Sequence, residues 1–123
     1  MRSRNAFLQA LHLMKRLDPR ISVNEVIAFL YAAENEGLTV QELAYVAGFT
    51  QSTASRSLRA LGPADSPWSQ GLALGLVEPF LNPKDGRSHL VQLSAQGREL
   101  RDRLDAIIRQ ATTIGPSRLT WAA

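Results

Sequence analysis

The sequence predicts a mainly α-helical fold that carries one small β-hairpin. Apolar residues recur at helical spacing in five stretches. Two of those stretches adjoin, with only the Gly48-Phe49 turn between them. Further along, two short strand-like segments flank Asp85-Gly86, a dipeptide typical of tight hairpin turns. Two short helices joined by a tight turn and followed by a hairpin are the pattern of a winged helix-turn-helix.

Composition limits the class of protein further. A chain of 123 residues is expected to form one domain around a single core. It has no cysteine, which excludes disulfides and thiolate metal sites. The longest apolar runs fall far short of the ~20 residues that a membrane span requires, and no basic-then-apolar leader opens the chain. We therefore expect a cytoplasmic protein with no membrane partner.

Charge is distributed unevenly along the chain, whose net charge is +3. Residues 21–48 contain four glutamates and no lysine or arginine. Residues 49–61, in contrast, contain Arg56 and Arg59 and no acidic residue. Such segregation is expected where one face of a protein meets phosphates and another meets solvent or protein.

The first helix is predicted over residues 5–17 and ends at Asp18-Pro19, because the residue before a proline is disfavoured in helical geometry. His12 lies in this helix, and we interpret it as a surface residue rather than a ligand. The helix is amphipathic and needs a partner surface, either in its own core or in a second subunit. Its apolar stripe consists of Phe7, Leu8, Leu11, Met14 and Leu17.

The second and third helices open with the same signal. Ser22 with Glu25, and Thr39 with Glu42, have the spacing of capping boxes, in which each side chain bonds the backbone of the other residue. The second helix is predicted over 23–36. Its buried side is expected to contain Val26, Ile27, Phe29, Leu30 and Ala33.

The helix-turn-helix is predicted over 38–61. Its second helix has Thr50 as N-cap, and apolar residues at i, i+4 and i+7 face the core. The opposite face has no carboxylate and no large apolar side chain. We expect this face to bind DNA through Gln51, Ser52, Thr53, Ser55, Arg56 and Arg59.

That face suits the major groove of DNA. Short hydroxyl and amide side chains allow the backbone to approach base edges, and arginine bonds guanine or phosphate. The alternative is a merely solvated helix face. Solvated faces usually mix both signs of charge, however, and this one has only positive charge. We therefore favour a recognition helix.

Residues 62–75 read as a loop, because proline, glycine and serine are frequent there. Trp68, Leu72 and Leu74 are too apolar for a freely mobile loop, so it is expected to pack on the body of the protein. We favour an ordinary ordered connection, and a loop that contacts DNA or a partner is the alternative.

The hairpin is predicted from strands over 76–81 and 89–93, with Pro79 placing the first at an edge. Its tip carries Lys84 and Arg87. A charged tip is often only a soluble turn. After a helix-turn-helix, it is also the position of a wing whose arginine enters the minor groove, where negative potential attracts it. Asp85 is expected to orient the wing by pairing with the Arg87 guanidinium.

The last helix is predicted over 95–113, with Ser94 as N-cap. Its apolar stripe continues into a tail that contains Leu119 and Trp121. The two terminal helices, 5–17 and 95–113, therefore offer more apolar surface than one small domain hides. We expect them to form a two-fold dimer interface, with the recognition helices about 34 Å apart to reach successive major grooves.

An enzyme is disfavoured. No glycine-rich phosphate loop follows a strand, and the two histidines lack metal-ligand spacing. Asp85, Ser88 and His89 are the three residue types of a catalytic triad. Neighbouring strand residues point to opposite faces, however, so Ser88 and His89 cannot form a hydrogen-bonded relay. We assign no catalytic residue, no metal and no cofactor. A winged helix that serves as a protein-interaction or replication-assembly module remains the alternative to a DNA-binding regulator.

The order of elements resembles the MarR family of bacterial winged-helix transcriptional regulators. The resemblance covers roughly residues 20–100. It rests on G-L-T-V-Q-E-L-A at 37–44, T-Q-S-T-A-S-R-S-L at 50–58 and G-L-V-E at 75–78. Most specific is P-K-D-G-R-S-H-L-V-Q-L-S-A-Q-G at 83–97, which is similar to the family's wing signature.

The resemblance implies a homodimer, most simply a repressor, that binds a pseudo-palindromic double-stranded DNA site. It implies Arg56 and its neighbours in the major groove and Arg87 in the minor groove. A small-molecule effector is possible, but no residue pattern supports one, and we assign none.

Overall fold

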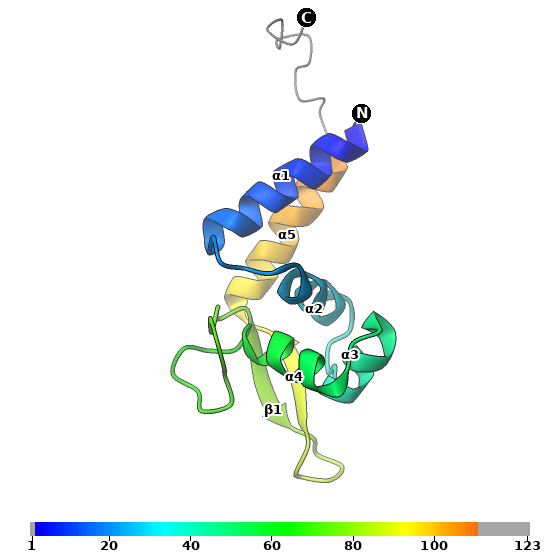
Figure 1. Ribbon diagram of the computed structural model, residues 1–123, viewed down its shortest axis with the longest axis vertical. Coiled ribbons are helices and arrows are strands. Elements are labelled where there is room, and N and C mark those ends of the chain that lie inside the picture. Colours follow the sequence, from blue (N-terminus) through cyan, green and yellow to red (C-terminus); the bar gives the residue numbers. More distant parts are fainter. Residues whose placement is uncertain (1, 111–123) are drawn as a thin grey trace, which may run out of the picture.

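The structure is a computed structural model that describes residues 2–110. In that range the chain forms, in order, α1 (Arg2–Leu17), α2 (Val23–Glu34), α3 (Val40–Ala47), α4 (Gln51–Arg59), β1 (Val77–Leu81), β2 (His89–Leu93) and α5 (Ala95–Arg109). The predicted order of helices and hairpin is confirmed (Figure 1). The predicted end of the last helix at 113 and the tail with Leu119 and Trp121 lie outside the described residues.

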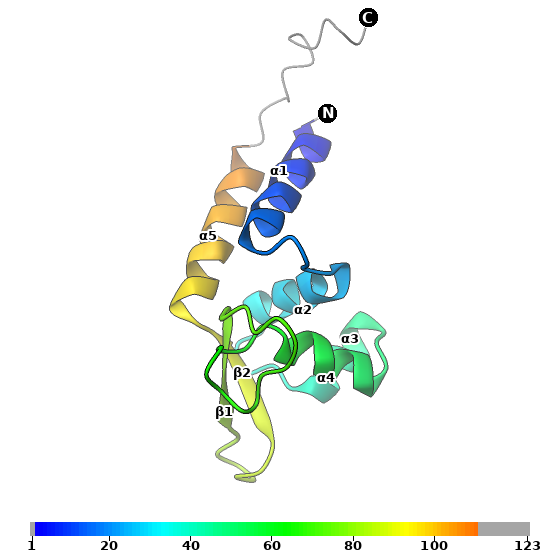
Figure 2. The ribbon, with the colours of Figure 1, turned by 60° about the vertical axis from the view of Figure 1, so that its left-hand side comes forward.

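The elements are arranged in two parts. Helices α1 and α5 lie side by side along one end of the molecule (Figures 1 and 2). Helix α2 lies next to them, and α3, α4 and the hairpin form the other end (Figure 2). The terminal helices are therefore separated from the tip of the hairpin by the long dimension of the molecule (Figure 1).

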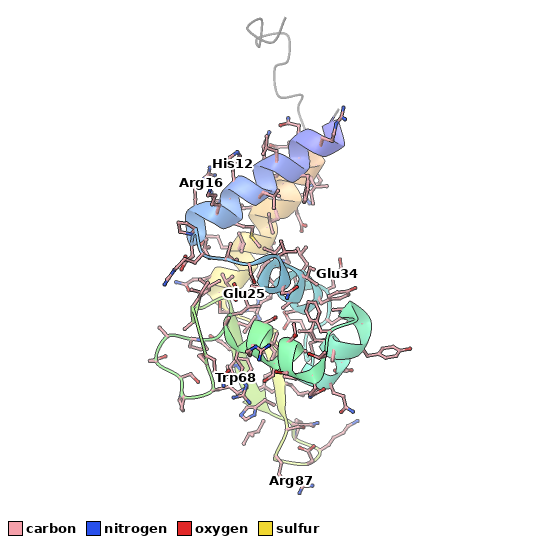
Figure 3. The ribbon with its side chains drawn as sticks, in the orientation of Figure 1. His12, Arg16, Glu25, Glu34, Trp68 and Arg87 are labelled. Carbon is pink, nitrogen blue, oxygen red and sulfur yellow. The ribbon has the colours of Figure 1, made fainter. Side chains whose placement is uncertain are left out.

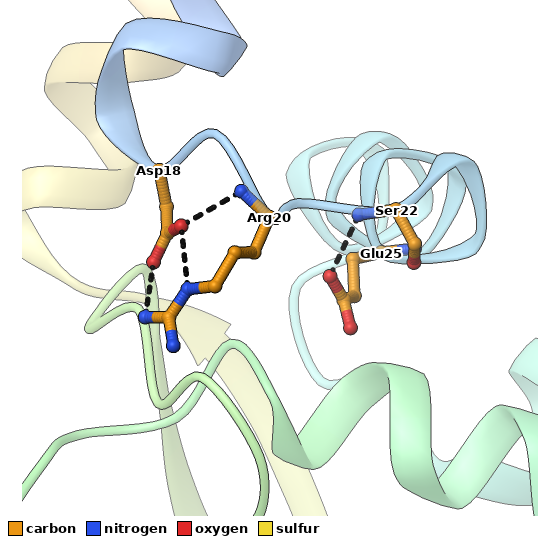
Figure 4. Close-up of polar contacts among 4 residues, drawn as sticks. All are labelled: Asp18, Arg20, Ser22 and Glu25. Atoms are coloured by element: carbon orange, nitrogen blue, oxygen red, sulfur yellow. Dashed lines mark hydrogen bonds and ion pairs between the residues drawn. The ribbon is translucent and has the colours of Figure 1, made fainter.

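Hydrogen bonds between near neighbours define where the second helix begins. The Glu25 N–H donates to Ser22 Oγ (3.2 Å), and the Ser22 N–H donates to Glu25 Oε1 (2.9 Å; Figure 4). The predicted capping box is thus confirmed, as is the equivalent one between Thr39 and Glu42 (2.9 and 3.0 Å). The helix ends at Glu34 rather than at 36, because Asn35 leaves the helical conformation and caps it.

The turn between α1 and α2 is organised by one carboxylate. Asp18 accepts hydrogen bonds from the Arg20 backbone N–H (2.9 Å) and from the Arg20 guanidinium (3.0 and 3.1 Å; Figure 4). These bonds from Arg20 lower the pKa of Asp18. The Arg20 side chain is exposed whereas that of Asp18 is largely covered, and the main effect of the pair is to set the direction in which the chain enters α2.

The core lies where α2, α4 and the hairpin meet. The Phe29 side chain on α2 is completely buried, in agreement with the prediction. Fully buried side chains from the other elements surround it, among them Leu43, Leu58, Leu61, Leu76, Val77, Val91 and Leu93. These contacts hold the helix-turn-helix against the base of the hairpin.

The hairpin strands pair in register, with Val77 opposite Leu93 and Pro79 opposite Val91. Val91 does not bond to Pro79: its N–H donates to the Leu38 carbonyl (2.9 Å), and its own carbonyl accepts from the Gly37 N–H (2.8 Å). Strand β1 is consequently the outer strand, and the N–H that proline lacks is not needed there. The predicted edge position of Pro79 is confirmed.

Several apolar side chains predicted on buried faces are exposed in the single chain. Leu30 is 47% exposed, which contradicts its predicted burial, and Ile108 on α5 is 62% exposed. On α1, Met14 is buried, whereas Phe7 is 66% exposed and Leu11 is 40% exposed. These exposed side chains line an apolar groove of about 540 Å³ between α1, α2 and α5.

Candidate nucleic-acid interface

A tight turn sets the angle between α3 and α4. Gly48 has φ +69°, a left-handed conformation that glycine adopts without strain. Thr50 then caps α4, accepting a hydrogen bond at its hydroxyl from the Thr53 N–H (3.1 Å). The predicted turn and cap are both confirmed. Together they place α4 on the surface, beside α3 and above the hairpin (Figure 1).

Helix α4 has one buried side and one polar side. Ala54, Leu58 and Leu61 are completely buried, as predicted, and Ser57 is buried with them. The opposite side is polar along the whole helix. Gln51, Ser52 and Arg56 are exposed, whereas Thr53, Ser55 and Arg59 are partly exposed. The structure therefore brings the six predicted contact residues onto one helix, but it does not expose them equally.

The exposed Arg56 is held along the helix rather than extended freely. Its Nη1 donates a hydrogen bond to Ser52 Oγ (2.9 Å). Residues four apart lie on the same helix face, so the i, i+4 spacing of Ser52 and Arg56 is the signal that predicts this contact. The bond directs the guanidinium towards the N-terminal half of α4, where the other small polar side chains lie.

Arg59 differs from the other predicted contacts, because residues 62–75 fold against it. Its guanidinium carbon lies 5.7 Å from the centroid of the Trp68 ring. Trp68 is 7% exposed and belongs to the core, so the prediction that this loop packs on the body is confirmed. Arg59 is thus not a free side chain on the face of the helix. The sequence alone does not pair these residues, since the loop conformation decides the contact.

The hairpin tip presents Lys84 and Arg87, both exposed, and Figure 3 shows Arg87 at the end of the molecule. The tip is closed by local bonds: Asn82 Oδ1 accepts from the Lys84 N–H (2.9 Å), and the Gly86 N–H donates to the Asn82 carbonyl (2.7 Å). Gly86 has φ +66°, and a Cβ at this position would have no neighbouring atom within 4 Å. Two cations therefore project from a well-defined turn at one end of the molecule.

Asp85 orients this tip in a different way from the one predicted. Its carboxylate accepts from the backbone N–H groups of Arg87 (2.9 Å) and Ser88 (3.1 Å), and from Ser88 Oγ (2.9 Å). The predicted pair with the Arg87 guanidinium does not form. The nearby N–H donors satisfy the carboxylate first, and they lower the pKa of Asp85. Asp85 shapes the backbone of the wing and leaves the Arg87 side chain free. An Asp with Ser three residues later is the signal for such a turn.

Nothing in the described residues forms a metal site or a membrane-spanning element. Residues 2–110 contain no cluster of three or more His, Asp or Glu side chains in ligating positions. Within the same range, no helix combines the length and apolarity that a membrane crossing needs. The Ser88 hydroxyl donates to Asp85 and stabilises the turn.

No family model and no curated protein matches the sequence. Solved structures with the same fold are nevertheless found. A MepR variant from a multidrug-resistant S. aureus clinical isolate has a TM-score of 0.68 and 20% identity, with 98% of this chain and 79% of that chain covered. RV1404 from Mycobacterium tuberculosis has a TM-score of 0.66 and 18% identity, covering 87% and 66% respectively. The chain thus spans slightly less than two thirds of the length of RV1404.

A third similar structure contains DNA. The transcriptional repressor CouR bound to a 23-mer DNA duplex has a TM-score of 0.60 and 22% identity, with 96% of this chain and 72% of that chain covered. At these identities the comparison concerns the fold. Five helices in the described residues, the two-stranded hairpin after the fourth and the long helix beside the first all agree with it. The chain has the winged-helix fold of the MarR-type transcription regulators.

Proposed function

We propose that this chain is a sequence-specific DNA-binding transcriptional regulator, most simply a repressor, that works as a homodimer in the cytoplasm. Helix α4 would enter the major groove, and the wing would enter the minor groove. The observation that carries the proposal is the polar face of α4, which has arginine and small polar side chains and no carboxylate. Binding rather than catalysis is the activity.

Two further facts support duplex DNA as the partner. The wing tip between β1 and β2 adds Lys84 and Arg87, and Figure 3 shows Arg87 on the same end of the molecule as α4. Regulators of the same fold, CouR and S. aureus MepR, have been solved as DNA complexes. A helix and a wing that present cations together fit neighbouring grooves of one duplex.

The dimer follows from the apolar surface at the other end. Phe7, Leu8 and Leu11 on α1 and Ile108 on α5 are each at least 40% exposed, and all but Leu8 line the apolar groove. Within residues 2–110 this patch is open to water, which is unfavourable. A second copy that covers it would join two chains at the end far from the wings, and so present two recognition helices to one face of the duplex.

The test begins with selection. The wild-type protein is used to select duplexes from a random-sequence pool, and affinities are measured by fluorescence anisotropy on the best duplex. Arg56→Ala should weaken specific binding by roughly 1–3 kcal/mol if Arg56 bonds a guanine, and Gln51→Ala should relax the preferred sequence. Arg16→Ala is the matched control, because Arg16 is exposed on α1 at the other end of the molecule (Figure 3).

Two outcomes would contradict the proposed function. If no duplex is enriched above a scrambled pool, the protein does not recognise DNA sequence. If a duplex is enriched but both α4 variants bind it as tightly as the wild type, then α4 is not the element that reads the bases.

A further inference from the structure

A cleft of about 500 Å³ opens between the end of α4, the 62–75 loop and the hairpin. Arg59 lines it from the helix, Trp68 from the loop, and Pro79 and His89 from the two strands. No carboxylate lines the cleft. It is thus a small concave site with a cation, aromatic rings and apolar walls, and it lies between the two elements proposed to enter the grooves of DNA.

The Arg59 guanidinium is fixed in this cleft but not satisfied. Its guanidinium carbon lies over the Trp68 ring, 5.7 Å from the centroid. Its Nε is buried and has no hydrogen-bond partner among the described residues. A buried donor without an acceptor is unfavourable, and the enclosed Nε cannot itself meet a ligand from solvent. The outer Nη groups of an arginine that lies over an aromatic ring can still donate to an anion, so it is this part of Arg59 that is available to an oxygen acceptor in the cleft.

The loop is built to hold Trp68 in this position. The Trp68 N–H donates to Ser66 Oγ (3.2 Å), and the Gln70 N–H donates to the carbonyl of Arg59 itself (3.1 Å). Gly62 makes room for the ring, since a Cβ there would come within 2.8 Å of it. On the far side, the His89 ring lies 6.3 Å from that of Trp68, between centroids. Two strands and a loop thus fix the surroundings of a single guanidinium.

We propose that this cleft binds one phosphate of the DNA strand that passes between the recognition helix and the wing. The inference rests on the function proposed above, because it needs a duplex in both grooves. Where a helix occupies the major groove and a wing the adjacent minor groove, a phosphate backbone must lie between them. Arg59 supplies the charge-assisted hydrogen bonds, and Trp68 is a positioning residue that fixes the direction of the guanidinium.

Ethylation interference on the selected duplex tests this directly, because an ethylated phosphate loses its charge. The wild type should show interference at one phosphate in each half-site that Arg59→Gln no longer shows. Arg59→Gln should also bind roughly tenfold more weakly, since it loses a charged hydrogen bond. The salt dependence of its log affinity should fall by about one unit per subunit. Arg16→Gln, which removes the same charge from α1, should retain the full interference pattern.

Two Trp68 variants separate positioning from simple folding. Trp68→Phe keeps an aromatic face and should retain interference at the Arg59 phosphate. Trp68→Leu should lose it there and keep it at the phosphates near Lys84. If Trp68→Leu does not fold, Arg59→Gln alone decides, because the Arg59 side chain lies partly exposed.

The outcomes distinguish the two proposals. No duplex bound by the wild type would overturn the proposed function itself. Wild-type binding together with an identical interference pattern for Arg59→Gln would overturn only the phosphate cleft and leave the DNA-binding function standing.

Discussion

Substituting Gly97 by alanine sets two opposing effects against each other. In the interior of a helix, alanine is about 1 kcal/mol more favourable than glycine, so helix propensity alone predicts stabilisation. Gly97, however, is buried in the first turn of α5. A Cβ there would overlap the Leu76 carbonyl oxygen and come within 3.1 Å of its carbon. The obstacle is backbone and cannot rotate away.

The structure indicates which effect is larger. The Leu76 carbonyl accepts from the Ser94 N–H (3.0 Å), and the Ser94 hydroxyl accepts from Gly97 and donates to Gly75 (3.0 and 2.7 Å). Moving Leu76 would strain this whole junction. Overpacking costs about 1–3 kcal/mol and a lost buried hydrogen bond about 1–3 kcal/mol more. With about 2 kcal/mol for each cost and about 1 kcal/mol gained in propensity, we expect a net loss of about 3 kcal/mol.

The measurements are urea unfolding and thermal unfolding, both followed by circular dichroism at one fixed protomer concentration so that association does not alter the result. A loss of this size should lower the melting temperature by roughly 10 °C. Gln96→Ala, at the exposed neighbouring position, is the control and should change little. If Gly97→Ala is as stable as the wild type or more so, the junction is pliable and the steric reasoning is wrong.

Four further predictions concern the wing and the dimer. Lys84→Ala should weaken binding to all duplexes alike and reduce the slope of log affinity against log salt concentration by about one unit. Arg87→Ala should lose most affinity on duplexes with narrow A·T-rich flanks. Equal losses on every flank would contradict insertion of Arg87 into the minor groove. Asp85→Ala should loosen the wing backbone and weaken binding despite removing a negative charge, so tighter binding at every salt concentration would show that Asp85 only repels DNA. The pKa of Asp85 is lowered in the folded state. The contribution of Asp85 to the stability of the wing is therefore fully present above the pKa of an unfolded aspartate and is lost as the pH falls through the folded value. Amide exchange at Ser88, measured at decreasing pH, would reveal this loss. Phe7→Glu together with Leu11→Glu should yield monomers in sedimentation velocity and abolish high-affinity binding, and a persistent dimer would place the interface elsewhere.

Features specified by near neighbours could be predicted from the sequence, whereas features set by distant contacts could not. The capping boxes at Ser22 and Thr39 act over three residues, so their spacing was sufficient to place the starts of α2 and α3. The partner of Arg59 depends on how the distant 62–75 loop folds. Asp85 is an exception, because its partners are only two and three residues away and the prediction still missed them. The sequence suggested that Asp85 would bind a guanidinium, but backbone donors in its own turn were closer. Leu30 was expected to be buried by its helical period, and none of the residues 2–110 covers it.

The β-type joint between residues 37–38 and Val91 has a mechanical consequence. Because Val91 bonds the segment between α2 and α3 on one side, and its strand pairs with β1 on the other, the helix-turn-helix and the wing share one strand. The two cannot spread apart without breaking that strand's hydrogen bonds. On a duplex, the distance between the recognition helix and the wing would therefore be fixed, and it would match only one spacing between the grooves. DNA that does not match would have to bend to fit, so the stiffness of a sequence, and not only its base edges, would decide where this protein binds tightly.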